Sequence, residues 1–226
     1  MQSYFTVQKD GEFELEIKKS RFICHVARVT DETAAQAFIA QVRKANLKAN
    51  HNCFAYQLGL TANIQKQSDD GEPSGTAGVP MLEVLRQMQL TNLCVVVTRY
   101  FGGIKLGTGG LIRAYSHATS AGLEHLGIVQ GIEQTACQIT IDYAQFDTVQ
   151  NLLSQLNLTA EDIQYTTNIQ MTVWLATTAV SDLQQQLTER LNGQLQFDLG
   201  PQQFNEVPIS AQDLHQIRYQ KRKKKD

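Results

Sequence analysis

The sequence predicts an α+β protein made of two domains. Its 226 residues exceed the usual single-domain length of roughly 100–150 residues. A hydrophobic fraction of 42% beside 19% charged residues is typical of a folded globular chain and argues against disorder. The pattern of expected strands and helices changes near residue 130. We therefore expect domains over residues 1–130 and 131–205, followed by a tail over residues 206–226.

The first domain begins with strands. Alternating acidic and apolar residues predict one strand over Glu12–Ile17, and a second extended segment follows over Arg21–Ala27. Asp31 is suited to cap the helix that comes next. His51–Leu58 predicts a third strand. Residues 59–80 hold four glycines and two prolines, which predicts a loop.

The rest of the first domain contains two helices around a buried strand. Pro80 suits the first turn of a short helix over Met81–Gln89. The apolar, β-branched segment Leu93–Val97 predicts a strand that is buried on both faces. A glycine-rich loop then leads into a helix that runs to about Leu126, where Gly127 is the expected stop.

The second domain follows an expected linker over Gly127–Gln134. The elements predicted after it are, in order, a strand, a helix, two strands, a helix and a strand: Ala136–Tyr143, Phe146–Leu156, Ala160–Tyr165, Asn168–Ala176, Val180–Leu191 and Gly193–Leu199. This βαββαβ order is that of the split-βαβ or ferredoxin-like unit. We therefore expect a four-stranded antiparallel sheet with two helices on one face.

Charge is distributed unevenly along a chain whose formal net charge is −2. Residues 1–130 hold 13 basic and 11 acidic side chains, residues 131–205 hold one and eight, and residues 206–226 hold six and three. The first domain and the tail are therefore mildly basic, and the second domain is strongly acidic. A phosphate backbone would be repelled by the second domain, so we expect any nucleic acid to contact the first domain and the tail, which we expect to be disordered.

The sequence favours a cytoplasmic location. Its four cysteines are widely spaced and form no C-x-x-C pair, which argues against a zinc site or a disulfide scaffold and favours reduced thiols. The first twelve residues are polar and do not resemble a signal peptide. The longest apolar run is far too short to span a bilayer, so we expect no membrane partner.

The strongest functional signal is a glycine-rich segment over residues 102–110. Five glycines lie within these nine positions at a junction between a strand and a helix. Glycine allows close approach to the backbone, and a helix N-terminus presents free N–H groups, so the segment can bind phosphate or a nucleic-acid backbone. Tyr100, Phe101 and Tyr115 can offer stacking faces; a tight turn that packs the helix on the sheet is the alternative. The candidate residues are Arg99, Tyr100, Gly102, Gly103, Lys105, Gly107, Thr108, Gly109, Gly110 and Arg113.

A second glycine-rich segment, over residues 68–80, carries three carboxylates. An acidic cluster in a turn can hold Mg²⁺ beside a phosphate, although Asp-Gly and Glu-Pro-Ser-Gly also favour ordinary turns. We assign no metal or other cofactor from spacing alone, and Mg²⁺ remains the one candidate. The residues of this acidic loop are Asp69, Asp70, Glu72, Gly75 and Thr76. His51 and Cys53 form a conceivable catalytic pair, but a packed strand explains them more simply.

These segments resemble the IMPACT (imprinted ancient) family, and in particular its bacterial YigZ-like members. The matching motifs are D-D-G-E-P-x-G-T-A-G-x-P at residues 69–80, V-V-V-x-R-Y-x-G-G-x-x-L-G-x-G-G-L at 95–111 and K-K-S-R-F at 18–22. The resemblance implies a first domain with a ribosomal protein S5 domain 2-like α/β fold. It also implies a second domain similar to the last, ferredoxin-like domain (domain V) of elongation factor G.

The resemblance implies a link to translation and no established catalytic residues. Family members are regarded as translation regulators, but the eukaryotic role in a kinase pathway uses an additional N-terminal domain that we do not expect here. We therefore expect a translation-associated regulator that binds RNA, the ribosome or translation-related proteins. Two alternatives stay open. One is a Mg²⁺-dependent enzyme acting on a phosphorylated small molecule, and the other is a module that binds proteins through the acidic second domain. The oligomeric state is not predicted.

Overall fold

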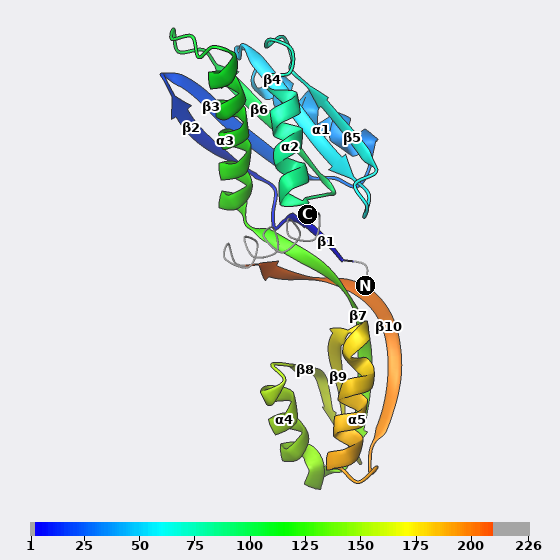
Figure 1. Ribbon diagram of the computed structural model, residues 1–226. Helices are drawn as coiled ribbons and strands as arrows, with labels where there is room; N and C mark the ends of the chain where they lie inside the picture. Colours follow the sequence, from blue (N-terminus) through cyan, green and yellow to red (C-terminus); the bar gives the residue numbers. More distant parts are fainter. Residues whose placement is uncertain (1–2, 210–226) are drawn as a thin grey trace, which may run out of the picture. The chain divides into compact units, whose positions relative to one another are not determined.

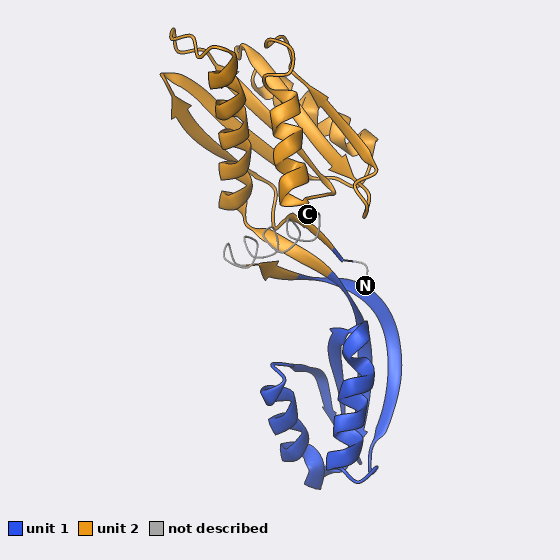
Figure 2. Cartoon of the chain, viewed as in Figure 1, with its two compact units in different colours: residues 1–3, 132–206 blue, residues 4–131, 207–226 orange. Residues whose placement is uncertain are grey.

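The computed structural model describes residues 3–209 and consists of two compact units with separate hydrophobic cores. Within the described residues, the first unit contains residues 4–131 and 207–209, and the second contains Ser3 and residues 132–206 (Figure 2). Each unit combines a β-sheet with helices, so the predicted α+β class is confirmed.

The first unit is built on a five-stranded sheet in the order β2-β3-β6-β4-β5, in which every neighbouring pair is antiparallel. The elements of this unit, in chain order, are β1 (Ser3–Val7), β2 (Gly11–Ile17), β3 (Ser20–Arg28), α1 (Glu32–Ala45), β4 (His51–Leu58), β5 (Ile64–Ser68), α2 (Gly78–Met88), β6 (Leu93–Tyr100) and α3 (Thr108–Leu126).

Helices cover both faces of this sheet (Figure 1). The central strand β6 sends Val95 and Val97 into a core shared with α2 and α3, while Cys94 and Val96 join the core beneath α1. Because successive side chains on a strand point to opposite faces, this apolar run is buried on both sides, as predicted. Asp31 caps α1 by accepting a hydrogen bond from the Ala34 N–H at 2.8 Å.

The second unit has the predicted order of strands and helices. Its elements are β7 (Ile128–Ile141), the 3-10 turn Tyr143–Gln145, α4 (Phe146–Gln155), β8 (Ala160–Tyr165), β9 (Ile169–Ala176), the 3-10 turn Thr177–Ala179, α5 (Val180–Arg190) and β10 (Gln196–Ile209). Strand β9 lies between β7 and β8, and β10 pairs with β7. Alternate residues of β7 and β9 pack with both helices in one core.

Several expectations about segments between elements were wrong. Residues 64–68 form the edge strand β5 within the expected loop; its exposed, mostly polar side chains lack an alternating apolar pattern. The expected linker at 127–134 lies mostly within the continuous strand β7, which also pairs with β1 in the N-terminal segment. Strand β10 runs to Ile209, so the first residues of the expected tail are ordered strand. The rest of the tail lies outside the described residues.

Candidate functional site

The two glycine-rich segments meet at one end of the first unit's sheet. The segment after β5 leads into α2, and the segment after β6 leads into α3, so both lie where these helices begin (Figure 1). Strand β4 starts at this same end with His51, because it is antiparallel to β6 and His51 pairs with Arg99. The fold therefore brings together the two sets of candidate residues that the sequence places about 30 positions apart.

Glu72 joins the two segments inside the protein. Arg99 Nη1 donates to Glu72 Oε1 at 2.7 Å, and the side chains of both residues are about 95% buried, with exposed fractions of 6% and 4%. The Tyr115 hydroxyl from α3 donates to the same carboxylate oxygen at 2.8 Å. His51 Nε2 lies 3.8 Å from the other oxygen. A buried ion pair with these extra hydrogen bonds fixes the relative position of both loops.

Arg99, a candidate phosphate-binding residue in the sequence, is therefore buried inside the first unit. Its guanidinium is enclosed between the rings of Phe22 and Phe101, with Cζ 5.4 and 5.6 Å from the ring centroids. Tyr115 is fully buried. Tyr100 is half-buried, and its hydroxyl donates to Asn46 Oδ1 at 2.9 Å. Arg99, Tyr100 and Tyr115 therefore make hydrogen bonds within the first unit.

Asp69 of the acidic loop accepts hydrogen bonds from the backbone of the same loop. Asp69 Oδ1 accepts hydrogen bonds from the N–H groups of Ala77 and Gly78 at 3.0 and 2.8 Å, and Oδ2 accepts from Gly75 at 2.8 Å. Asp69 therefore caps the N-terminus of α2, whose own N-cap residue is an alanine without a capping side chain. The Thr76 hydroxyl, also buried, donates to the Pro73 carbonyl at 2.6 Å.

These carboxylates do not fit a Mg²⁺ site. Asp70 accepts from Arg43 Nη2 and from the Asn52 N–H, both at 2.6 Å, while Asp69 and Glu72 are engaged as described. Mg²⁺ needs carboxylate oxygens that face a common open space with room for several waters. Here the acids instead face arginines and backbone N–H groups. Among the described residues, no group of three or more His, Cys, Asp or Glu side chains is placed to hold a metal ion.

The His51 and Cys53 pair does not form a nucleophilic site either. Cys53 is buried, and its thiol donates to the Asp69 carbonyl at 2.9 Å. His51 Nδ1 lies 2.9 Å from the Asp70 carbonyl oxygen. A reactive cysteine needs a lowered pKa, whereas burial raises the pKa of the thiols to about 12 in Cys24, Cys53 and Cys94.

Structural demands explain most of the glycines in the second segment. A Cβ at Gly102 would lie 1.9 Å from the carbonyl oxygen of Lys19, so only glycine allows the loop to pack against the turn between β2 and β3. Gly103 and Gly107 have φ values of 86° and 69°, which favour glycine. Gly110 would place a Cβ 3.1 Å from Leu106 Cβ.

Gly109 alone among these five glycines has no such explanation. Its φ is not positive, and the nearest atom to an added Cβ would be Arg113 Nη1 at 3.9 Å. Glycine within a helix costs roughly 0.5–1 kcal/mol relative to alanine. Gly109 lies in the exposed first turn of α3, where no side chain caps the helix N-terminus. The open backbone at this position is therefore suited to a ligand that approaches closely.

Four exposed cations belong to α3, to the loop that leads into it or to the turn that packs against that loop. Lys105 and Arg113 come from the loop and from α3, and Lys18 and Lys19 come from the β2–β3 turn that packs against Gly102. None of the four forms an ion pair or hydrogen bond with another described residue. We call residues 101–113 together with Lys18 and Lys19 the glycine-rich face. In the sequence the two lysines stand out only as part of a family motif, because their position next to Gly102 depends on how the β2–β3 turn packs.

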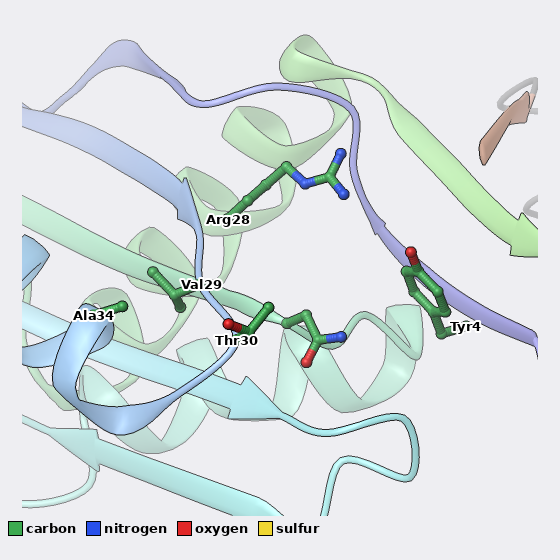
Figure 3. A pocket seen from close by; sticks show the side chains of 6 residues that line it. Tyr4, Arg28, Val29, Thr30 and Ala34 are labelled. Atoms are coloured by element: carbon green, nitrogen blue, oxygen red, sulfur yellow. The ribbon is translucent and has the colours of Figure 1, made fainter. Parts of the chain in front are cut away.

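A separate hollow lies at the opposite end of the sheet, where β3 ends (Figure 3). Its volume is about 210 Å³, below the ~300–1,000 Å³ of typical small-molecule sites. It contains none of the residues singled out above; those that line it are Tyr4, Arg28, Val29, Thr30, Ala34 and Asn92. We take the glycine-rich face as the candidate site because of its open backbone at Gly109 and its exposed cations.

Comparisons with known proteins agree with the motifs at this site. A family model described as the Impact N-terminal domain matches residues 18–123, and one described as a domain of unknown function matches residues 139–194. The chain is 43% identical over 210 residues to the IMPACT family member YvyE of Bacillus subtilis, covering 93% of this chain and 97% of the relative. The chain belongs to the IMPACT family.

Other IMPACT family relatives span both units as well. The chain is 36% identical to the IMPACT family member YigZ of Escherichia coli over 184 residues, which are 80% of this chain and 90% of that protein. A crystal structure described as a hypothetical protein is 34% identical, with a TM-score of 0.56 and coverage of 87% of this chain and 97% of the other.

In the described residues, no helix is both long and apolar enough to cross a membrane.

Proposed function

We propose that this IMPACT family protein is a translation-associated regulator that binds RNA through the glycine-rich face. The observation that carries the proposal is the open first turn of α3 at Gly109, together with four exposed cations of the glycine-rich face that form no ion pair with any residue the structure describes. Membership of the family supports the link to translation. The cytoplasmic location expected from the sequence is part of the same proposal.

The physical basis is the attraction of phosphate to this face. The first N–H groups of a helix lack internal partners and carry a partial positive charge, which favours an anion. Arg113 extends back toward Gly109, and Lys105 belongs to the preceding loop. Together with the two turn lysines, these cations can contact successive phosphates. The buried pair of Glu72 and Arg99 beneath them holds both loops, so the face requires little ordering on binding.

The first unit is the favoured place for RNA because the second unit is acidic. Residues 131–205 carry eight acidic side chains and one basic one. A phosphate backbone is repelled by such a field. The alternative of a Mg²⁺-dependent enzyme receives no support, because the carboxylates it requires are engaged with Arg43, Arg99 and backbone N–H groups.

Fluorescence anisotropy with a labelled twelve-nucleotide oligouridine tests the proposal. Binding by the full chain should weaken steeply as salt rises, because each neutralised phosphate of a single strand contributes a log–log slope of about −0.7. The double substitution Lys105→Gln and Arg113→Gln should reduce that slope by about 1.4. A matched control, Lys9→Gln with Lys66→Gln, removes two exposed cations distant from the face.

The control should retain the wild-type slope. If the wild-type protein shows no salt-sensitive RNA binding, or if both double variants lose binding equally, the glycine-rich face is not an RNA site.

A further inference from the structure

Phe101 is the only exposed Phe, Tyr or Trp side chain among the described residues of the first unit, with an exposed fraction of 46%. It lies at the start of the glycine-rich face. Its backbone N–H donates to Asn50 Oδ1 at 2.8 Å, and the next N–H, of Gly102, donates to Ser20 Oγ at 3.2 Å. These two bonds fix the backbone that carries the ring, so the ring is held in place although it is exposed.

The inner side of the ring lies against a buried cation. Arg99 Cζ is 5.6 Å from the centroid of Phe101, and Arg99 is itself fixed by Glu72. A guanidinium beside an aromatic ring is attracted by the negative face of the ring. This contact occupies one side of Phe101, and the remainder of the ring is exposed, in the same loop that carries Lys105 and leads into α3.

From this geometry we propose that Phe101 is a stacking platform for one unpaired nucleobase. This inference rests on the proposed function and narrows its ligand to RNA that is single-stranded at this point. A flat aromatic face beside phosphate-binding cations is how proteins bind single strands, because every base has a π-face. In an RNA duplex the base faces are covered by their neighbours, and recognition is limited to phosphates and 2′-hydroxyls.

A purely structural role for Phe101 predicts a different result. The ring also covers the guanidinium of Arg99, and any apolar side chain of similar size would provide that cover. Phe101→Leu keeps an apolar cover and removes the π-face, while Phe101→Trp keeps both. Tyr165→Leu, which removes an exposed aromatic side chain from the second unit, is the matched control.

The experiment compares two probes of equal length and charge: a labelled oligouridine and the same backbone with abasic riboses at its central positions. The wild-type full chain should bind the oligouridine about 5- to 150-fold more tightly, the factor that corresponds to ~1–3 kcal/mol for stacking one base. Phe101→Leu should lose this preference without losing affinity for the abasic probe. Phe101→Trp and Tyr165→Leu should keep it.

Three other outcomes are informative. If the wild-type protein binds both probes equally, Phe101 is no stacking platform, although the proposed RNA function stands. If the protein prefers oligouridine and Phe101→Leu keeps that preference, the base stacks elsewhere and the inference is wrong. If neither probe binds, the proposed function fails together with this inference. Thermal unfolding of each variant identifies any that do not fold. If Phe101→Leu does not fold, the ratio of affinities for the two probes is compared between Phe101→Trp and the wild-type protein.

Discussion

Replacing Glu72 by glutamine should destabilise the first unit strongly. The substitution keeps the shape of the side chain but removes the only carboxylate within residues 3–209 that pairs with Arg99, whose side chain is 6% exposed. Breaking a buried ion pair by neutralising one partner typically costs 3–5 kcal/mol, because the other charge remains buried without compensation. Glutamine retains one oxygen for Arg99 or Tyr115, so we expect about 3 kcal/mol.

The same substitution on the surface gives the control. Glu14 pairs with Arg21 through two hydrogen bonds of 2.7 and 2.8 Å, which are as short as those of Glu72. The side chains are 46% and 51% exposed, and exposed pairs contribute only about 0.2–1 kcal/mol. Glu14→Gln should therefore change the free energy of unfolding by less than about 1 kcal/mol.

Urea unfolding followed by far-ultraviolet circular dichroism measures both variants. The single tryptophan, Trp174, lies on β9 in the second unit, so its fluorescence reports on that unit separately. Glu72→Gln should lower the unfolding midpoint seen by circular dichroism, and adding Arg99→Met should recover part of the loss. A change below about 1 kcal/mol in Glu72→Gln, or an equal change in Glu14→Gln, would refute the argument that the buried pair holds the loops.

Three further predictions concern the same unit. Asp69→Asn should cost about 1–2 kcal/mol in urea unfolding, because the amide cannot accept all three backbone hydrogen bonds that cap α2. Gly102→Ala should destabilise the protein by about 1–3 kcal/mol through its clash with the Lys19 carbonyl. Gly109→Ala should be neutral or stabilise it by about 0.5–1 kcal/mol. Equal effects of the two substitutions on urea unfolding would contradict the distinction between Gly102, which packing requires, and Gly109, which it does not. Raising the pH from 8 to 10 should lower the free energy of unfolding by about 1.4 kcal/mol for each of the three thiols whose pKa burial raises to about 12. The sign follows because the unfolded thiols ionise near their ordinary pKa while the folded ones stay protonated, so stability is lost from about pH 9 upward; an unchanged urea midpoint at pH 10 would contradict it.

The fold could be predicted where each segment carries its own periodic signal. The first five residues of β6, Leu93–Val97, are apolar and buried on both faces, and α1 has a capping aspartate and helical spacing. Strand β5 lacked any such signal, because an edge strand with exposed side chains needs no apolar alternation. Strand β7 starts directly after Gly127, and the glycine that ends α3 looked like the beginning of a linker. Pairing with neighbouring strands makes both segments β-strands, and the periodicity of the sequence does not show which strands will be neighbours.

The sequence shows which candidate residues are close together along the chain, but not the direction in which their side chains point. The sequence shows that Arg99 adjoins a glycine-rich loop, but not that Glu72, 27 residues earlier, is buried against it. Strand alternation places Arg99 on the same face as Val95 and Val97, which pack beneath α2 and α3. An inward arginine at that register needs a buried acid as its partner. The carboxylates of the acidic loop are therefore candidates for this buried acid before they are candidates for metal ligands.

The division of the glycines changes how the glycine-rich face should be probed. A substitution at Gly102 alters the packing of the loop on the β2–β3 turn, and one at Gly103 or Gly107 forces a side chain into a left-handed backbone conformation. Loss of RNA binding in such variants would report a displaced loop and would say nothing about contact with phosphate. Gly109 is different, because a side chain added there meets only open space and the end of Arg113. If Gly109→Val weakens RNA binding while the unfolding midpoint stays unchanged, the ligand itself occupies the space beside the first turn of α3.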